Sequence, residues 1–361
     1  MRYRFAALLA CWLCLACHSQ VAGSQPEPEA DTPADTRGGF RDFLNRDAVR
    51  GALTVIRDIA GQVAFSWATT QDSRYGLFLD DDWRQRTSGR PLIVIVHGYG
   101  SNAEEFDALR GKLRDAGLAS AVFSYPNDAR LALSGREFAT ALQAFERRYP
   151  DRRLALVAHS MGGLVSRVAI EDPDSALLEN IDQLIMVATP NQGSNLARVP
   201  VSLDVWQNWL DGKPDTVKTV FFESVLDGLN EARFDLQPES ELLARLNGLP
   251  RNPDVRYSLL LGNRGPATRE QLDELRRIII DSQQTNVALR ALGPRLGTLL
   301  EDLDELVDGL GDGAVAVERG RLDGVDDTIV LDFNHGSIAS QLTDASSTRL
   351  VSEILTRLNR R

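Results

Sequence analysis

The junction around Ser160 is the feature that most constrains what this chain of 361 residues can fold into. An apolar run, 154–157, is followed at once by Ala-His-Ser-Met-Gly-Gly at 158–163 and then by a helical pattern. A serine hydroxyl is a weak nucleophile, so an enzyme that uses one must hold it on a tight turn beside a base and amide donors. Glycines at such a turn let backbone segments approach closely. The junction therefore predicts a serine displayed where a buried strand turns into a helix.

Apolar runs alternate with helical patterns from residue 90 onward. We expect strands near 91–96, 120–124, 153–158, 182–188, 255–261 and 328–332, and helices near 103–116, 135–148, 162–171 and 346–359. This alternation predicts an α/β fold with a mostly parallel central sheet and helices on both faces. Two longer insertions, about 195–250 and about 265–310, interrupt the order. We expect them to be largely helical and to form a cap beyond the strand ends.

A serine nucleophile needs a base, and the chain has four histidines: His18, His97, His159 and His335. His18 lies at the edge of a leader segment, and His159 adjoins the serine and must point away from it. His97 opens a separate motif that ends the apolar run 91–96. His335 follows a short predicted strand near the end of the chain and remains as the candidate base.

Four segments resemble those of the lipase and esterase branch of the α/β-hydrolases. Segment 158–163 resembles the nucleophile elbow of that superfamily, with Ala158 in place of the first glycine. Segment 91–100 resembles the oxyanion strand, which implies that the backbone N–H groups of Tyr99 and Met161 bind the oxyanion. Segment 189–194 is similar to a loop that follows the next strand in these enzymes. Segment 311–317 resembles the stretch that supplies the acid of the catalytic triad, which favours Asp312.

The identity of the acid depends on this last resemblance, because several aspartates lie between the serine and His335. The competitors are Asp302, Asp304, Asp308, Asp323, Asp326 and Asp327. The chain order serine, acid, histidine is the order found in α/β-hydrolases.

The resemblance implies a serine carboxylic-ester hydrolase that works through an acyl-enzyme with Ser160, His335 and Asp312. Its substrate would be an ester with an apolar acyl group, which Trp206, Trp209 and Leu210 of the first insertion would contact if that insertion is an acyl-chain lid. A packed cap is the other reading of these side chains. Thioesterase, amidase and acyltransferase activities use the same fold, and a non-catalytic envelope-binding module is an alternative of another class.

Composition excludes several other functions. The formal net charge is −11, which argues against binding a nucleic-acid backbone. The sequence has no phosphate-binding loop, no dinucleotide-binding glycine motif and no paired-cysteine or His-Glu-x-x-His metal motif. We therefore expect no cofactor and no metal, and the sequence leaves the oligomeric state open.

The N-terminal region is typical of an exported bacterial protein. Residues 1–17 resemble a signal peptide that ends in a lipobox-like Leu-Ala-Cys, which makes Cys17 a lipidation candidate. We expect a flexible linker at 18–39, a helix and strand segment at 40–89 packed on the main domain, and the hydrolase domain at 90–361. These features favour a membrane-anchored lipoprotein of the cell envelope over a free periplasmic or secreted protein.

Overall fold

The computed structural model describes residues 75–86, 89–99, 101–126, 129–198, 231–270, 273, 277, 304–339 and 342–360. The expected signal peptide with Cys17, the linker at 18–39, residues 40–74 and the cap residues Trp206, Trp209 and Leu210 lie outside the described residues. The sheet and its helices belong to one compact unit, Ile59–Arg198, Leu229–Thr268 and Leu303–Arg361. No helix in the described ranges is long and apolar enough to cross a membrane.

The described part of the chain forms a seven-stranded sheet in the order β1-β3-β2-β4-β5-β6-β7. All neighbouring strands pair in parallel except β1, which is antiparallel to β3 at one edge. The strands are β1 (Gly76–Leu79), β2 (Leu92–Val96), β3 (Ser120–Ser124), β4 (Leu154–His159), β5 (Ile181–Val187), β6 (Arg256–Gly262) and β7 (Thr328–Leu331). The predicted α/β class with a mostly parallel sheet is therefore confirmed.

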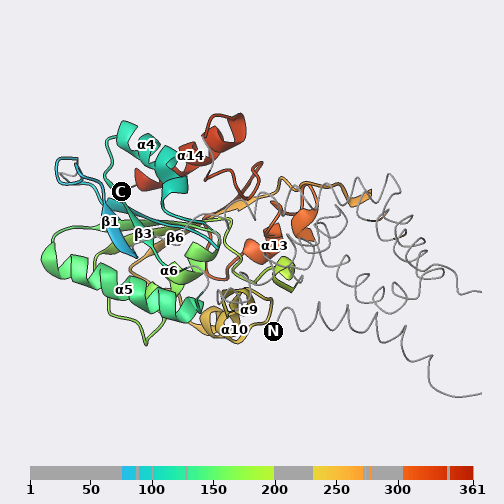
Figure 1. Cartoon of the computed structure of the whole chain (residues 1–361), viewed down its shortest axis with the longest axis horizontal. Helices are drawn as coiled ribbons and strands as arrows, with labels where there is room; N and C mark the ends of the chain where they lie inside the picture. The colour runs from blue at the N-terminus through green and yellow to red at the C-terminus, as the bar shows by residue number, and fades with distance from the viewer. Residues whose placement is uncertain are drawn as a thin grey trace, which may run out of the picture. The chain divides into compact units, whose positions relative to one another are not determined.

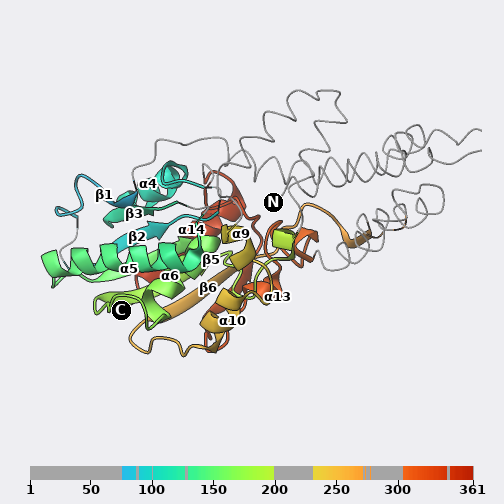
Figure 2. The same ribbon diagram turned by 60° about the horizontal axis from the view of Figure 1, so that its bottom comes forward.

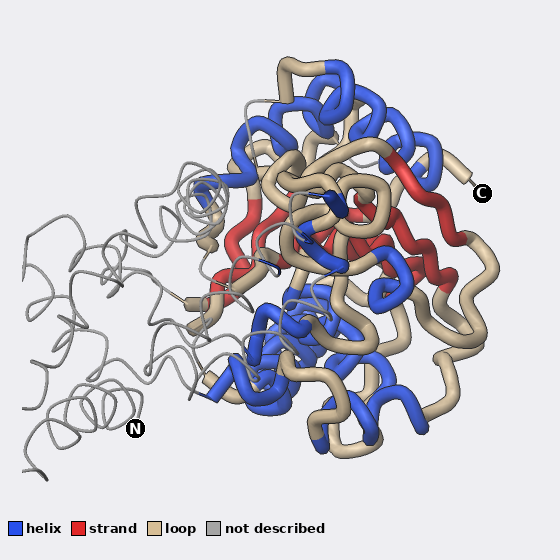
Figure 3. The backbone as a smooth tube through the Cα atoms, turned by 90° about the vertical axis from the view of Figure 1, so that its right-hand side faces the viewer, coloured by secondary structure: helices blue, strands red, loops and turns tan. Residues whose placement is uncertain are grey.

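Helices cover both faces of this sheet, as Figures 1 and 3 show. One face packs against α5 (Leu131–Arg148) and α6 (Met161–Glu171), and the other against α4 (Asp107–Asp115) and α14 (Ala345–Leu358). Every residue of the central strands β2 and β4 is buried, which explains why both read as unbroken apolar runs. The shorter elements are η1 (Glu104–Phe106), η2 (Asn195–Arg198), η3 (Asp304–Leu306), α9 (Glu231–Asp235), α10 (Glu241–Gly248) and α13 (Val317–Gly320).

Helix α5 begins at Leu131, four residues before the start that the sequence pattern predicts. The backbone N–H of Leu131 donates to the Asp235 carboxylate at 3.0 Å, so a side chain from α9 satisfies one of the orphan donors of the first turn. Leu131 itself is fully buried. Tertiary contacts therefore set this helix boundary, and no local pattern could have indicated it.

The turn between β4 and α6 requires its glycines because backbone segments meet there. A Cβ on Gly162 would lie 2.4 Å from the carbonyl oxygens of both Val96 and His97. A Cβ on Gly163 would lie 2.0 Å from Thr189 Oγ1, at the end of the neighbouring strand. The two glycines thus let α6 start directly against the ends of β2 and β5.

Replacing Gly162 by alanine should destabilise the protein. The new methyl group meets backbone oxygens that cannot move aside, and overpacking of this kind costs about 1–3 kcal/mol. Gly111 in α4 is the matched control, because a Cβ there meets nothing within 4 Å. Gly111→Ala should raise the free energy of unfolding by up to about 1 kcal/mol through helix propensity. Urea unfolding of both variants measures the difference, and equal effects would contradict the packing argument.

Candidate active site

Three polar side chains meet at the carboxyl ends of the parallel strands. Ser160 follows β4, His335 follows β7, and Asp312 lies in the excursion between β6 and β7. The carboxyl ends of parallel strands form one edge of a sheet, which is where α/β proteins place their ligands. Helices α9 and α13 lie at the same end in both Figure 1 and Figure 2.

The three side chains form a continuous hydrogen-bonded chain. Ser160 Oγ lies 2.9 Å from His335 Nε2, and His335 Nδ1 lies 3.0 Å from Asp312 Oδ2. An ionised carboxylate only accepts, so Nδ1 carries the proton in the neutral ring and Nε2 is left to accept from the serine hydroxyl. This arrangement lets His335 remove the proton of Ser160.

Asp312 is fixed by the backbone around it. Its side chain is 1% exposed, and its Oδ1 accepts from the backbone N–H groups of Ala314 and Val315 at 2.9 and 2.8 Å. Its own carbonyl accepts from the backbone N–H of His335 at 2.8 Å. Both oxygens of the carboxylate are therefore used, one to anchor the group and one to orient the imidazole.

Ser160 occupies a backbone conformation that few residues adopt. Its φ of 53° and ψ of −127° turn the chain sharply between β4 and α6. Its N–H donates to the Val187 carbonyl at 2.8 Å and its carbonyl accepts from the N–H of Gly163 at 3.0 Å. The turn is thus held by the neighbouring strand and by the first residues of the helix, with the side chain projecting from its apex.

The loop that carries Tyr99 lies directly over this serine. A Cβ on Gly98 would lie 2.8 Å from Ser160 Cβ, so the backbone at 97–99 runs against the nucleophile turn. Met161 is the first residue of α6, where a backbone N–H has no acceptor within its own helix. The predicted pair of amide donors therefore belongs to two segments that both adjoin Ser160.

The other two described histidines have structural contacts. His97 is buried, stacks on Tyr125 with ring centroids 4.4 Å apart, and donates from Nδ1 to the Gly98 carbonyl at 3.0 Å. Burial lowers the pKa of His97 to about 4, so its ring stays neutral. Tyr125 OH donates to the His97 carbonyl at 2.7 Å. Both contacts brace the loop that carries Tyr99.

His159 points away from Ser160 and toward the chain around His335. Its Nε2 donates to the His335 carbonyl at 2.9 Å, and the two rings lie 4.8 Å apart. Burial, followed by the charge of His335, lowers the pKa of His159 well below its usual value. His159 thus holds the loop of the candidate base without a charge of its own. The sequence had indicated only that this side chain points away.

His335 Nδ1 donates to Asp312, and the competing Asp327 has other partners. Asp327 pairs with Arg357 at 2.7 Å and accepts from Ser258, at the opposite end of β6. Burial acts to raise the pKa of Asp327, but hydrogen bonds from Arg357 and Ser258 together with the charges of Arg357 and Arg360 outweigh burial, and the pKa is lowered. Asp302 lies outside the described residues. No group of three or more His, Cys, Asp or Glu side chains in the described ranges could hold a metal ion.

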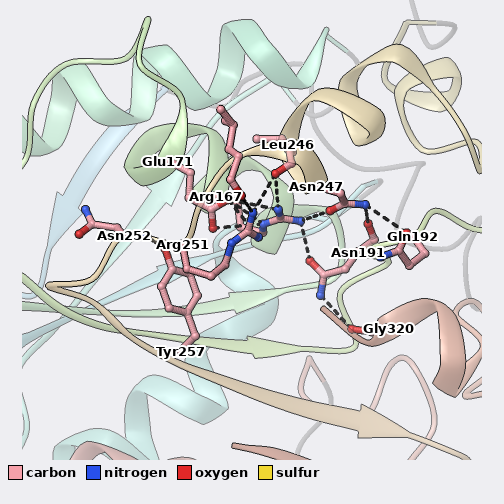
Figure 4. A network of polar contacts seen from close by, with 11 residues as sticks. Arg167, Glu171, Asn191, Gln192, Leu246, Asn247, Arg251, Asn252, Tyr257 and Gly320 are labelled. Atoms are coloured by element: carbon pink, nitrogen blue, oxygen red, sulfur yellow. Dashed lines mark hydrogen bonds and ion pairs between the residues drawn. The ribbon is translucent and has the colours of Figure 1, made fainter. Parts of the chain in front are cut away.

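A fully buried arginine fixes the far end of the helix that follows Ser160. Arg167 donates to both carboxylate oxygens of Glu171, to the side chains of Asn191 and Asn247, and to the Leu246 carbonyl (Figure 4). These contacts tie α6 to the loop after β5 and to the end of α10. Asn191 extends the network by donating to the Gly320 carbonyl of α13 at 2.9 Å.

Removing this arginine should destabilise the fold strongly. Arg167→Met leaves Glu171 with Arg251 as its one remaining cation and leaves the side-chain oxygens of Asn191 and Asn247 without this donor, and breaking a buried pair costs about 3–5 kcal/mol. Arg321→Met is the control, because Arg321 is 50% exposed and pairs at the surface with Glu318, which is 80% exposed. That variant should cost less than about 1 kcal/mol. Chemical denaturation compares the two, and similar losses would contradict the assigned role of Arg167.

Comparison with solved structures identifies a similar fold in a Bacillus licheniformis lipase, BlEst2. Its mature form is 20% identical with a TM-score of 0.52, and the match covers 78% of this chain and 97% of that one. Its propeptide form is 19% identical with a TM-score of 0.53, and the match covers 79% of this chain and 54% of that longer chain. The fold is that of the α/β-hydrolases, in which lipases and esterases are found.

One family model matches the sequence itself, over residues 55–288. It is described as a domain of unknown function, DUF7379. The match covers well over half of the chain, and the chain belongs to the DUF7379 family.

Proposed function

We propose that this protein is a serine carboxylic-ester hydrolase. The observation that carries the proposal is the hydrogen-bonded chain from Ser160 Oγ through His335 to the buried Asp312, with distances of 2.9 and 3.0 Å. A nucleophile, a base and an orienting carboxylate in this geometry are the parts that acyl transfer requires. The α/β-hydrolase fold, shared with a lipase, supports the same class of chemistry.

In the proposed reaction, Ser160 Oγ attacks the ester carbonyl carbon while His335 Nε2 takes the hydroxyl proton. The backbone N–H groups of Tyr99 and Met161 bind the negatively charged oxygen of the tetrahedral intermediate. Asp312 stabilises the imidazolium and holds its orientation. The protonated His335 then gives its proton to the leaving alkoxide. Water then attacks the acyl carbon while His335 takes one of its protons, and the bond to Ser160 Oγ breaks as His335 returns that proton to the serine and the acid leaves.

The substrate class is an ester with an apolar acyl group. In this proposal, the acyl group contacts Trp206, Trp209 and Leu210 of the first insertion. We further propose that a lipid attached to Cys17 anchors the mature protein to the bacterial cell envelope. Thioesterase, amidase and acyltransferase activities differ from ester hydrolysis only in the leaving group or the acceptor.

Ser160→Ala should abolish hydrolysis while leaving the fold intact. Loss of a triad nucleophile lowers kcat by up to about 10⁶. The measurement is hydrolysis of p-nitrophenyl esters of increasing acyl length, beside phospholipid and thioester substrates. A fluorophosphonate probe should label the wild-type serine and leave the variant unlabelled. An unlabelled wild-type protein without turnover would instead favour the non-catalytic envelope module.

Asp312→Asn should lower kcat by about 10⁴, because an amide in place of the carboxylate neither fixes the tautomer of His335 nor stabilises its charged form. Asp323→Asn is the matched control, since Asp323 is exposed and has the same side chain in the same region of the sequence. It should leave kcat unchanged. Steady-state kinetics of both variants decides the assignment, and an equal loss in both would remove Asp312 from the mechanism.

A further inference from the structure

A buried glutamate lies beside the turn that carries Asp312. Glu305 belongs to η3 (Asp304–Leu306), and its side chain is fully buried. Glutamate is almost never fully buried unless it is paired, because burial disfavours a charged or polar group that lacks partners. Glu305 forms no ion pair within the described part of the chain. Its burial therefore needs an explanation other than charge pairing.

The carboxyl group of Glu305 contacts a distant loop. Its Oε1 accepts from the backbone N–H of Asn195 at 2.7 Å. Asn195 is buried and begins η2 (Asn195–Arg198), directly after the loop 189–194 that follows β5. The other oxygen, Oε2, is buried and accepts no hydrogen bond from the described residues. The carboxyl group thus links η3 to the loop after β5 through one oxygen.

The backbone of the same glutamate supports the Asp312 turn. The Glu305 carbonyl accepts from the backbone N–H of Gly313 at 2.8 Å. A Cβ on Gly311 would lie 2.5 Å from both the Cα and the carbonyl oxygen of Glu305. The two residues that flank Asp312 therefore both lie directly against Glu305, and a shift of Glu305 would move the turn.

The loop after β5 reaches the Asp312 turn at a second point. Ser194 Oγ donates to the Ala314 carbonyl at 2.7 Å. The Ala314 N–H in turn donates to Asp312 Oδ1 at 2.9 Å. Glu305 and Ser194 thus join the same two segments of the chain. These contacts help to fix the turn from which Asp312 Oδ2 reaches His335 Nδ1 at 3.0 Å.

The contact between Glu305 and Asn195 does not require a charge. Burial raises the pKa of Glu305, and the Asn195 N–H and the charge of Arg319 offset only part of that rise. A protonated carboxyl group still has an oxygen that accepts from a backbone N–H. An amide side chain of the same length has such an oxygen as well. Glutamine is therefore the conservative replacement at this position.

We infer that Glu305 is a positioning residue of the candidate active site, which holds the Asp312 turn against the loop after β5 so that Asp312 meets His335. Glu305 acts through Asp312 and touches neither the ester nor the reacting atoms. The kinetic consequence of this inference rests on the proposed ester hydrolysis. The structural consequence, the placement of Asp312 beside His335, does not.

The kinetic test compares two substitutions of Glu305. Glu305→Met keeps the length of the side chain and removes the acceptor, whereas Glu305→Gln keeps an acceptor. Glu305→Met should lower kcat for p-nitrophenyl butyrate by about 10- to 100-fold, because a displacement of about 1 Å can cost up to about 10² in rate. KM should stay within about twofold, since Glu305 does not contact the ester. Glu305→Gln should keep kcat within about threefold of the wild-type value.

Glu146 provides the matched control, because it is another buried glutamate that accepts from backbone N–H groups. It lies in α5 and accepts from Asn180 at 2.9 Å and from Glu179 at 3.3 Å, at the end of the sheet opposite the candidate active site. Glu146→Met should lower Tm and leave the kcat of the folded protein unchanged. An equal fall of kcat in Glu146→Met and Glu305→Met would overturn the inference. A kcat of Glu305→Gln as low as that of Glu305→Met would overturn it as well.

Proton NMR gives a readout that does not depend on turnover. A ring N–H that donates to a carboxylate gives a low-field resonance, and the one from His335 Nδ1 is identified by its loss in Asp312→Asn. We expect this resonance in the wild-type protein and in Glu305→Gln, and its loss in Glu305→Met. An unchanged resonance in Glu305→Met would overturn the inference. Failure of the proposed function is seen separately, as a wild-type protein that a fluorophosphonate probe does not label.

Discussion

The site depends on one strained turn at Ser160. A non-glycine residue at positive φ costs of the order of 1–3 kcal/mol, so the surrounding structure must over-determine this conformation. Three contacts do so: the bond from Ser160 N–H to β5, the approach of Gly162 to β2, and the approach of Gly163 to Thr189. Each contact needs the parallel sheet already in place. The reactive geometry is therefore a property of the whole sheet and not of the local sequence.

The three described histidines differ in burial, and their roles differ accordingly. His97 and His159 are buried, and burial lowers the pKa of each, so both stay uncharged and serve as donors to backbone carbonyls. The His335 side chain is 20% exposed and lies between a hydroxyl and a carboxylate. A charge can develop on His335 at a site where solvent and Asp312 stabilise it. The same residue type thus braces two loops and provides one candidate base.

Much of the fold could be predicted from the sequence because parallel strands are buried on both faces. β2 and β4 are unbroken apolar runs, and their observed bounds lie within a residue of the expected ones. The start of α5 could not be predicted, since it depends on a cap from Asp235 far along the chain. Among many aspartates, only resemblance to a known family favoured Asp312. The physical distinction between Asp312 and Asp327 lies in their partners, His335 for one and Arg357 for the other.

A cavity at the starts of β5, β6 and β7, lined by Gln183, Arg256 and Asp327 among others, could not have been predicted from the sequence for a related reason. Gln183, Arg256 and Asp327 are separated by about 70 residues each, and they meet because β5, β6 and β7 start side by side. A single polar residue at the start of a strand has no sequence pattern around it that would indicate a cavity. The serine between a strand and a pair of glycines, in contrast, has a pattern that indicates a nucleophile turn.

Helix α6 connects the two ends of the sheet. Ser160 caps its N-terminus, and Glu171 is its last residue, about 16 Å away at 1.5 Å per residue. Glu171 also pairs with Arg251, which lies between α10 and β6. The guanidinium groups of Arg167 and Arg251 both contact the buried Glu171 carboxylate. Neither can move away easily, because a displaced guanidinium would lose its partner in a low-dielectric interior. The helix is therefore fixed at both ends by polar contacts that the apolar core could not supply. Because Ser160 is held in a strained turn, the helix that follows it must be fixed in place in this way.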